Sequence, residues 1–266
     1  MTLADVIETL ETAYPPGRAE SWDAVGLVAG DPAQAVRKVL FAVDPVTVVA
    51  EEALDWGADL IVTHHPLYLR GTTSVAATTP KGRLITTLIK NDIALYTAHT
   101  NADVANPGVS DALARAVGLT GDLVPLSPFP DDPWRGLGRI GELASPMPLS
   151  EFSAQVAKGL PATAWGIRVA GDPDRLVTRV AVSGGAGDSM LATARAAGVD
   201  VFLTADLRHH PASEFMETGG PALIDAAHWA TEWPWLADAA SILAAGGINV
   251  ETRVSATVTD AWTRGY

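Results

Sequence analysis

The sequence contains no cysteine among its 266 residues. This absence excludes disulfide bonds, so the chain carries no mark of an oxidising compartment. It also excludes thiolate ligands, which leaves histidine nitrogens and carboxylate oxygens to bind any zinc, iron or manganese tightly. The six histidines are therefore the first residues to consider as metal ligands.

Basic side chains are scarce in this sequence. It has 18 Lys and Arg, only four of them Lys, against 31 Asp and Glu, and its formal net charge is −13. Nucleic-acid binding depends on basic side chains that displace counterions from phosphates, and no short window concentrates them here. We therefore expect no nucleic-acid partner, and we attribute the acidity to solubility.

Long apolar runs are also absent. The longest, such as 39–43, have the length of a strand, whereas a membrane-spanning helix needs about 20 residues. Residues 1–8 include acidic side chains where a signal peptide requires a basic start and an apolar run. We expect no membrane partner and a cytoplasmic location.

The composition is that of a globular protein, with 48% hydrophobic and 18% charged residues. Hydrophobic periodicity predicts helices and strands that alternate along the chain, which favours an α/β fold with mixed or mostly parallel sheets. The helices are expected at 3–13, 47–56, 81–90, 110–117, 149–160, 189–197, 211–218 and from Thr231, which is predicted as an N-cap with Glu232 at the helix start. The strands are expected at 39–43, 59–63, 93–98, 136–143, 165–169, 180–182, 199–204 and 222–225.

The length and a segment rich in Pro, Asp and Ser predict two lobes. We expect a first α/β lobe at 1–124, a connector at 125–135 and a second α/β lobe at 136–266. The C-terminal segment is expected to contribute to a site that both lobes share.

Three strings that contain histidine follow predicted strands, where α/β sheets gather their ligands. They are His64-His65-Pro66, His99 to Asp103, and His228 to Glu232. Each His and acid pair four residues apart is, taken singly, typical of a surface salt bridge. Adjacent histidines at a strand end can address two neighbouring ions or form an exposed turn. All three strings together favour a dinuclear metal site.

The charge of such a site indicates its chemistry. Two divalent ions bring four positive charges, of which Asp103, Glu232 and a bridging hydroxide offset three. The remaining positive charge attracts an anionic or carbonyl group, and paired ions lower the pKa of bound water. Hydrolysis by a metal-bound hydroxide is the predicted reaction class.

Other segments offer weaker candidates. Gly184, Gly185 and Gly187 follow a strand and precede a helix, so their amides can bind an anion or form a tight structural turn. Their spacing matches neither the dinucleotide-binding motif nor the P-loop. His210, beside His209, lines a pocket as a proton carrier or lies on the surface. Asp23 is a further pocket candidate, and its neighbour Trp22 is expected in the core.

Taken together, these strings resemble the Nif-three-like family, which is described as dinuclear metal-centre hexamers and often labelled GTP cyclohydrolase type 2 homologues. The resemblance runs over nearly the whole chain. The motifs that carry it are 21–27, 57–67, 93–103, 183–187 and 223–232. The sequence departs from the family pattern at Ala24, where Asn is usual, at Ala227, where Gly is common, and at His209.

The resemblance implies two α/β lobes with a metal site in the cleft between them and no inserted middle domain. It implies that two divalent ions, Zn, Fe or Mn, are ligated by residues at five positions, with His99 close by as a weaker ligand or a supporting residue. It also implies a toroidal homohexamer. The five ligands are His64, His65, Asp103, His228 and Glu232.

Three functions are compatible with such a centre. The first is a metal-dependent hydrolase of a small anionic or nucleotide-like substrate. The second is a non-catalytic scaffold that binds or delivers metal. The third, implied by the family label, is GTP cyclohydrolase-type ring opening.

Overall fold

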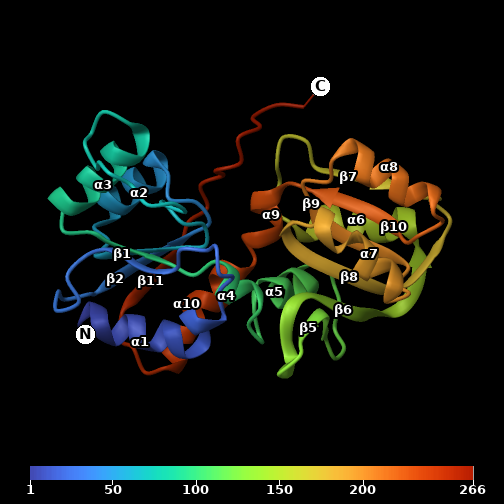
Figure 1. Cartoon of the computed structure of the whole chain (residues 1–266), viewed down its shortest axis with the longest axis horizontal. Coiled ribbons are helices and arrows are strands. Elements are labelled where there is room, and N and C mark those ends of the chain that lie inside the picture. The colour runs from blue at the N-terminus through green and yellow to red at the C-terminus, as the bar shows by residue number, and fades with distance from the viewer. Residues whose placement is uncertain (266) are drawn as a thin grey trace. The chain divides into compact units, whose positions relative to one another are not determined.

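The computed structural model describes residues 1–265, which divide into two compact units. The first unit contains residues 1–102 and 236–259, and the second contains 103–235 and the residues from 260 onward. Each unit has its own sheet and its own hydrophobic core (Figure 1). The mixed α/β fold class predicted from the sequence is confirmed.

The first unit is built on a five-stranded sheet in the order β1-β4-β3-β2-β11. β2, β3, β4 and β11 run parallel, and β1 is antiparallel to β4. β2 and β3 are almost wholly buried apolar runs, as strands covered on both faces require. The strands are β1 (Gly26–Ala29), β2 (Lys38–Ala42), β3 (Leu60–Thr63), β4 (Ala94–Thr97) and β11 (Glu251–Val254).

Helices cover both faces of this sheet (Figure 1). α2 (Thr47–Trp56) and α3 (Pro80–Lys90) lie on one face, and α1 (Leu3–Ala13) and α10 (Trp235–Ala245) lie on the other. A capping box between Thr2 and Asp5 starts α1, since each side chain accepts a hydrogen bond from the other residue's amide. α2 ends at Gly57 because its φ of 72° is left-handed, which glycine adopts without strain.

The parallel strands bring sequence-distant residues to one edge of the sheet. β2, β3, β4 and β11 all end at this edge, and β1 begins there because it is antiparallel to its neighbour β4. The segments that follow these four strands, and the one that precedes β1, are therefore neighbours. They carry Asp44, His64 with His65, His99, Thr259 and Asp23.

The second unit is built on a six-stranded mixed sheet in the order β5-β6-β8-β9-β10-β7. β8, β9 and β10 are parallel, and the remaining pairings are antiparallel. One core cluster packs α7 and α8 on the sheet through buried side chains that include Ala181, Phe202 and Leu223. The strands are β5 (Val124–Phe129), β6 (Asp132–Pro148), β7 (Ile167–Ala170), β8 (Leu176–Ala186), β9 (Val201–Ala205) and β10 (Ala222–Ala226).

The helices of the second unit vary widely in length. α5, α6 and α9 contact β8. The helices are α4 (Thr100–Asp103), which crosses the unit boundary, α5 (Val109–Ala116), α6 (Leu149–Gly159), α7 (Leu191–Ala196), α8 (His209–Glu217) and α9 (His228–Glu232). Two short 3-10 helices, Pro16–Arg18 in the first unit and Asp188–Met190 in the second, complete the elements.

The units differ from the predicted lobes in two places. The expected connector at 125–135 instead contains most of β5, the turn that follows it and the start of β6, and β5 tolerates its prolines because it is an edge strand. The C-terminal segment 236–259 belongs to the first unit, where β11 pairs with β2. The sequence does not predict that the chain returns to the first unit, because β11 is short and its side chains are largely exposed.

The prediction of Thr231 as a helix N-cap is wrong. α9 begins three residues earlier at His228, so Thr231 lies within the helix and Glu232 lies at its end. The Thr231 hydroxyl donates to the His228 carbonyl at 2.7 Å. Alanine at 227 offers no side-chain cap, which removes the start signal that sequence reasoning looks for.

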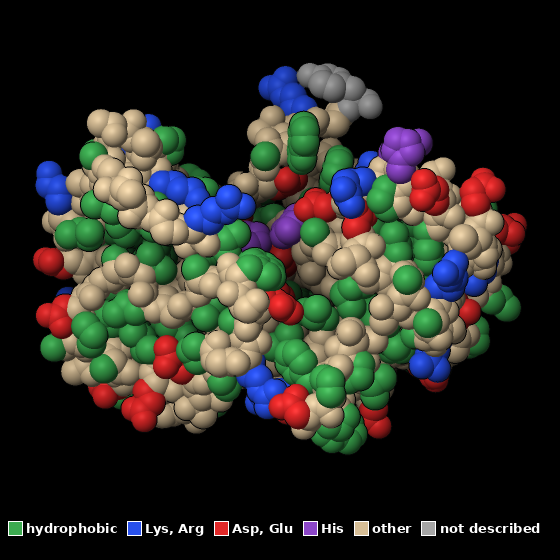
Figure 2. Space-filling model, viewed as in Figure 1, with side chains coloured by type: hydrophobic (Ala, Val, Ile, Leu, Met, Phe, Trp, Pro, Cys, Tyr) green, Lys and Arg blue, Asp and Glu red, His purple; other side chains and the backbone are tan. Residues whose placement is uncertain are grey.

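Two further features concern the length of the helices and the charge of the surface. Among residues 1–265, no helix combines the length and apolarity needed to cross a membrane. On the face drawn in Figure 2, Lys and Arg side chains are interspersed with acidic and apolar ones and form no continuous basic patch.

Candidate metal-binding site

Three histidines of the first unit meet at the carboxyl edge of its sheet. His64 and His65 follow β3, and His99 follows the neighbouring strand β4. The ring centroids of His64 lie 5.1 Å from those of both His65 and His99, and the His65 and His99 centroids are 5.5 Å apart. One ligand atom from each residue lies within 4.8 Å of the others, so the three can hold a metal ion.

The tautomer of His64 follows from its hydrogen bond. Its fully buried ring places Nδ1 3.0 Å from the carbonyl oxygen of Ala98. A carbonyl only accepts, so Nδ1 carries the hydrogen and donates it. Nε2 is then the nitrogen with the lone pair, which is the form that binds metal.

His65 is held by a carboxylate. Its Nδ1 donates to Oδ1 of Asp44 at 2.7 Å, and its amide donates to the Val43 carbonyl at 2.9 Å. The other oxygen of Asp44 accepts from the hydroxyl of Thr259, beyond β11. A carboxylate that accepts from Nδ1 orients the ring and raises the basicity of Nε2, as in the carboxylate–histidine–metal arrangement.

His99 is held in the same way by Asp23. Its Nδ1 donates to Oδ1 of Asp23 at 2.8 Å, and the Asp23 side chain is fully buried. The amide of Thr100 donates to Oδ2 of Asp23 at 3.0 Å, and the Thr100 hydroxyl donates to the same oxygen. Asp23 thus fixes both the ring and the first turn of α4.

Burial and hydrogen bonding set the charge of this pair. Burial favours a raised pKa for Asp23, but the hydrogen bonds from His99 and Thr100 outweigh it and hold the pKa below its ordinary value. Burial, together with repulsion from His64, lowers the pKa of His99 despite its bond to Asp23. A charged Asp23 beside a neutral His99 is the resulting state, and neutral imidazole is the ligand form.

The second unit contains a matching pair at the carboxyl edge of its own sheet. His228 begins α9 after β10, and Asp206 follows β9. Nδ1 of His228 donates to Oδ2 of Asp206 at 2.7 Å, and its Nε2 lies 2.9 Å from Oε1 of Glu232. Because both ring nitrogens face carboxylates, the contact between Nε2 and Glu232 requires a proton or a cation.

The glycine segment packs against this pair. Gly185 has a left-handed φ of 68°, and a Cβ there would lie 2.7 Å from Oε1 of Glu232 and 3.2 Å from Nε2 of His228. Its amide donates to the Thr231 hydroxyl at 2.9 Å, which ties the segment to α9. Glycine is required here by close approach as well as by φ.

The backbone amides of Gly184, Gly185 and Gly187 each donate a hydrogen bond to a residue of the second unit. Gly184 donates to the Ser110 hydroxyl at 3.3 Å, Gly185 to Thr231, and Gly187 to the Ala205 carbonyl at 3.2 Å. Gly184 and Gly185 lie within β8, and the 3-10 helix that follows has only three residues. These contacts favour the tight structural segment, and anion binding by these amides stays a prediction.

Three further residues singled out from the sequence lie at the end of a helix or at the surface. Asp103 ends α4 and is the first residue of the second unit, and its predicted role as a ligand stays a prediction. His210 is exposed on α8. Trp22, expected in the core, is 56% exposed, and its ring lies 6.0 Å from that of His99 in an edge-on arrangement.

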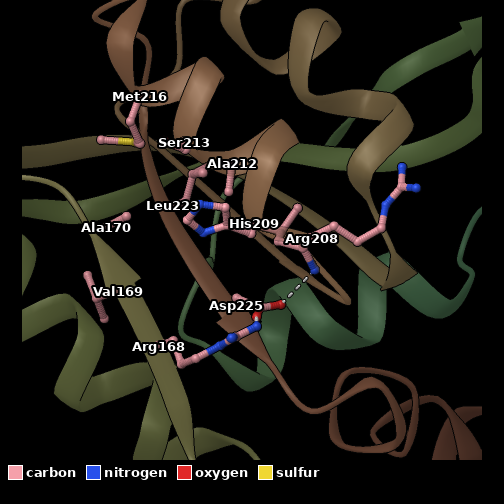
Figure 3. Close-up of a pocket in the computed structure, with 11 residues that line it drawn as sticks. Arg168, Val169, Ala170, Arg208, His209, Ala212, Ser213, Met216, Leu223 and Asp225 are labelled. Carbon is pink, nitrogen blue, oxygen red and sulfur yellow. Dashed lines mark hydrogen bonds and ion pairs between the residues drawn. The ribbon is translucent and has the colours of Figure 1, made fainter.

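His209 lines a cavity of about 340 Å³ in the second unit, whereas His210 is not among the lining residues described (Figure 3). The floor is apolar, with Leu223 and Met216 among its side chains. An ion pair between Arg168 and Asp225 lies at one side of the cavity in Figure 3. Of the two histidines, His209 lines this cavity, and the predicted role of His210 in a pocket stays a prediction.

Sequence reasoning missed three residues that orient the ligands. Asp44 and Asp206 each hold a histidine, and Thr259 contacts Asp44. Both aspartates follow a predicted strand within two residues, so the rule that located the histidines could have found them. No local signal marks Thr259, because its position depends on the pairing of β11 with β2.

The chain has close relatives of known sequence and structure. Residues 1–261 match the family described as Duf34/NIF3 (NGG1p interacting factor 3). A Streptomyces coelicolor protein named GTP cyclohydrolase 1 type 2 homolog is 60% identical, over 98% of this chain and 93% of its own length. A crystal structure of a hypothetical protein from Staphylococcus aureus has a TM-score of 0.89 at 29% identity, with 99% of both chains covered.

A Mycobacterium tuberculosis relative with the same name is longer. It is 40% identical over 98% of this chain and 96% of its own length, in an alignment of 367 positions. Since this chain has 266 residues, at least 101 of those positions have no counterpart here. The match over almost the entire length, with these relatives, shows that the chain belongs to the Duf34/NIF3 family.

Proposed function

We propose that the protein binds two divalent metal ions and, when loaded, hydrolyses a small anionic substrate. The observation that carries this proposal is the common orientation of four histidines. Nδ1 of each donates to an oxygen acceptor, so that Nε2 is the ligand atom. The proposed ligands are His64, His65, Asp103, His228 and Glu232, with His99 as a sixth candidate.

The donor atoms fit the ions that histidine and carboxylate prefer. Zn, Fe and Mn all accept imidazole nitrogen, and no cysteine is present to select among them. Nε2 of His228 and Oε1 of Glu232 are 2.9 Å apart, close enough for both to reach one ion at bond lengths of about 2.0–2.2 Å. Each of the three histidines of the first unit offers a nitrogen within 4.8 Å of those of the other two.

The surrounding residues have definable roles. Asp23, Asp44 and Asp206 orient rings by accepting from Nδ1, and Thr231 links Glu232's helix to Gly185. Bound divalent ions would act as Lewis acids and lower the pKa of coordinated water. The proposed ligands, three neutral imidazoles and two carboxylates, would leave two divalent ions with net positive charge at the ligand positions, which supports an anionic substrate. The name that the relatives share places GTP among the nucleotides to test.

A metal-binding scaffold without catalysis is the second candidate. The observation that favours it is that Asp23 and Asp44, the described carboxylates in contact with the histidines of the first unit, are both engaged in orienting them. Neither is then free to serve as a general base. Rapid transfer of metal to a chelator without turnover of any substrate would favour this function.

The test is turnover by metal-loaded protein on a panel of phosphoesters, nucleotides including GTP, and amides. We expect His64→Ala and Glu232→Ala to lose metal and activity together, and His210→Ala, an exposed histidine outside the ligand set, to retain both. Activity that persists in metal-depleted His64→Ala and Glu232→Ala proteins would show that the hydrolysis does not depend on this site.

The family resemblance also leads us to propose a toroidal homohexamer in the cytoplasm. Light scattering of the purified protein after size-exclusion chromatography should give six times the chain mass of 27.7 kDa. A monomer or dimer at micromolar concentration would contradict the proposed assembly without affecting the proposed metal site. Fractionation of cells that express the chain tests its location.

A further inference from the structure

The segment after β11 lies beside the histidines of the first unit for a topological reason. β11 is parallel to β2, so both strands end at the same edge of the sheet. The segment then contacts the end of β2 and helix α2, both in the first unit. Residues 255–259, which we call the C-terminal strap, form these contacts.

In the C-terminal strap the polar side chains face the protein and the apolar ones face solvent, which is the reverse of an ordinary amphipathic segment. Ser255 is buried and Thr257 and Thr259 are partly buried, whereas Ala256 and Val258 between them are exposed. Alternate residues of an extended chain face opposite sides, so the three hydroxyls share the inner side. Polar contacts, rather than apolar burial, therefore hold the C-terminal strap in place.

The first two hydroxyls bind one carboxylate on α2. Ser255 donates to Oε2 of Glu52 at 2.6 Å, and Thr257 donates to the same oxygen at 2.9 Å. These contacts anchor the C-terminal strap to the helix. They do not involve the histidines.

The third hydroxyl has a different partner. Thr259 donates to Oδ2 of Asp44, whose Oδ1 accepts from Nδ1 of His65 at 2.7 Å. Asp44 is thus held between the C-terminal strap and His65. With one oxygen fixed by the Thr259 hydroxyl, rotation of the carboxylate is restricted, and the direction of the His65 ring is restricted with it.

We propose that Thr259 is a positioning residue for metal binding, which acts through Asp44 on His65. This inference rests on the proposed metal site. Residues that orient a ligand through a hydrogen bond typically affect metal affinity by about 10–100-fold. Thr259 acts one contact further out, so its loss should reduce affinity by about 10-fold, the lower end of that range.

The experiment measures Zn²⁺ affinity by competition with a fluorescent chelator, and the visible absorption of the Co²⁺-loaded protein. Thr259→Val removes the hydroxyl and keeps the shape of the side chain, and Thr259→Ser restores the hydroxyl. Thr257→Val is the matched control, since it is the same change two residues earlier with Glu52 as its partner. Asp44→Asn, alone and with Thr259→Val, completes a double-mutant cycle.

We expect weaker Zn²⁺ binding and an altered Co²⁺ spectrum in Thr259→Val, and wild-type values in Thr259→Ser and Thr257→Val. Thr259→Val should have little further effect when Asp44 is already changed. Wild-type affinity in Thr259→Val, or equal losses in Thr257→Val and Thr259→Val, would overturn the inference while leaving the metal site intact. Failure of the wild-type protein to bind Zn²⁺ or Co²⁺ would instead refute the proposed function, and this inference with it.

Discussion

Gly185 and Glu232 are in such close contact that no side chain fits between them. A Cβ on Gly185 would lie 2.7 Å from Oε1 of Glu232, and Gly185 has a left-handed φ of 68°. A glycine in β8 thereby sets the position of a carboxylate on α9, and through it the 2.9 Å contact between Glu232 and His228.

Gly185→Ala should therefore damage the metal site more than the fold. Alanine at this φ costs about 1–2 kcal/mol, and the new methyl group must also displace Glu232. Gly219→Ala is the control, because its φ is also 68° but a Cβ there meets nothing within 4 Å. We expect a somewhat larger loss of unfolding free energy in Gly185→Ala than in Gly219→Ala in chemical denaturation, and loss of metal only in Gly185→Ala. Equal metal affinity in the two variants would contradict this role of Gly185.

The aspartates that hold the histidines should matter for metal binding in both units. Asp44→Asn and Asp206→Asn each keep the size of the side chain but weaken the acceptor for Nδ1. We expect each to reduce metal affinity by about 10–100-fold in isothermal titration. Asp188→Asn, which alters an exposed ion pair with Arg208, should leave affinity unchanged. Wild-type affinity in either of the first two variants would show that the orientation of that ring is dispensable.

Acidification should destabilise the metal-free protein through His99 and then Asp23. The pKa of both groups is lowered in the folded state, from ordinary values of 6.5 and 3.8. The unfolded chain then binds more protons, so stability is present above these ordinary values and is lost as pH falls through the folded ones. Thermal unfolding from pH 8 to 4 should show a declining midpoint below about pH 6.5.

His99→Gln should flatten the upper part of that decline, because it removes the group that titrates there. Parallel curves for the wild-type and variant proteins between pH 7 and 5 would show that His99 contributes nothing to the acid sensitivity. Both proteins must be stripped of metal first, since bound metal also depends on deprotonated histidines.

Arg139 is a buried charge in the second unit. Its side chain is 1% exposed, and it donates to the buried carboxylate of Asp111 at 2.8 and 2.9 Å. Arg139→Ala would leave that carboxylate uncompensated and should cost about 3–5 kcal/mol in denaturant unfolding. Arg179→Ala, at an exposed position of β8, should change stability by no more than about 0.5 kcal/mol. A small effect of Arg139→Ala would mean that water solvates Asp111 in its place.

Sequence periodicity located the strongly amphipathic elements closely. The predicted helices 3–13 and 47–56 match α1 and α2 residue for residue, because each has a clear apolar face and a definite end. β1 and β11 were missed because their side chains are largely part-buried or exposed, so no alternation marks them. Their pairing depends on contacts far along the chain, which local patterns cannot report.

The same distinction between local patterns and long-range contacts applies to the residues of the candidate site. His64, His65, His99 and His228 could be identified from residue type and from their places after strands. Two of the oxygen acceptors that fix their tautomers could not be assigned, since Ala98 contributes a backbone carbonyl and Asp23 comes from a loop 76 residues before His99. Ligands are marked by their chemistry, whereas the groups that orient them are brought there by the fold.

The most direct test of the account is the metal content of the purified protein, measured by elemental analysis after equilibration with Zn²⁺, Fe²⁺ or Mn²⁺ and removal of loosely bound ions. The account predicts two ions per chain in the wild-type protein, and fewer in both His64→Ala and His228→Ala, which alter ligands of different units. Wild-type protein without bound metal, or full occupancy in both variants, would contradict it.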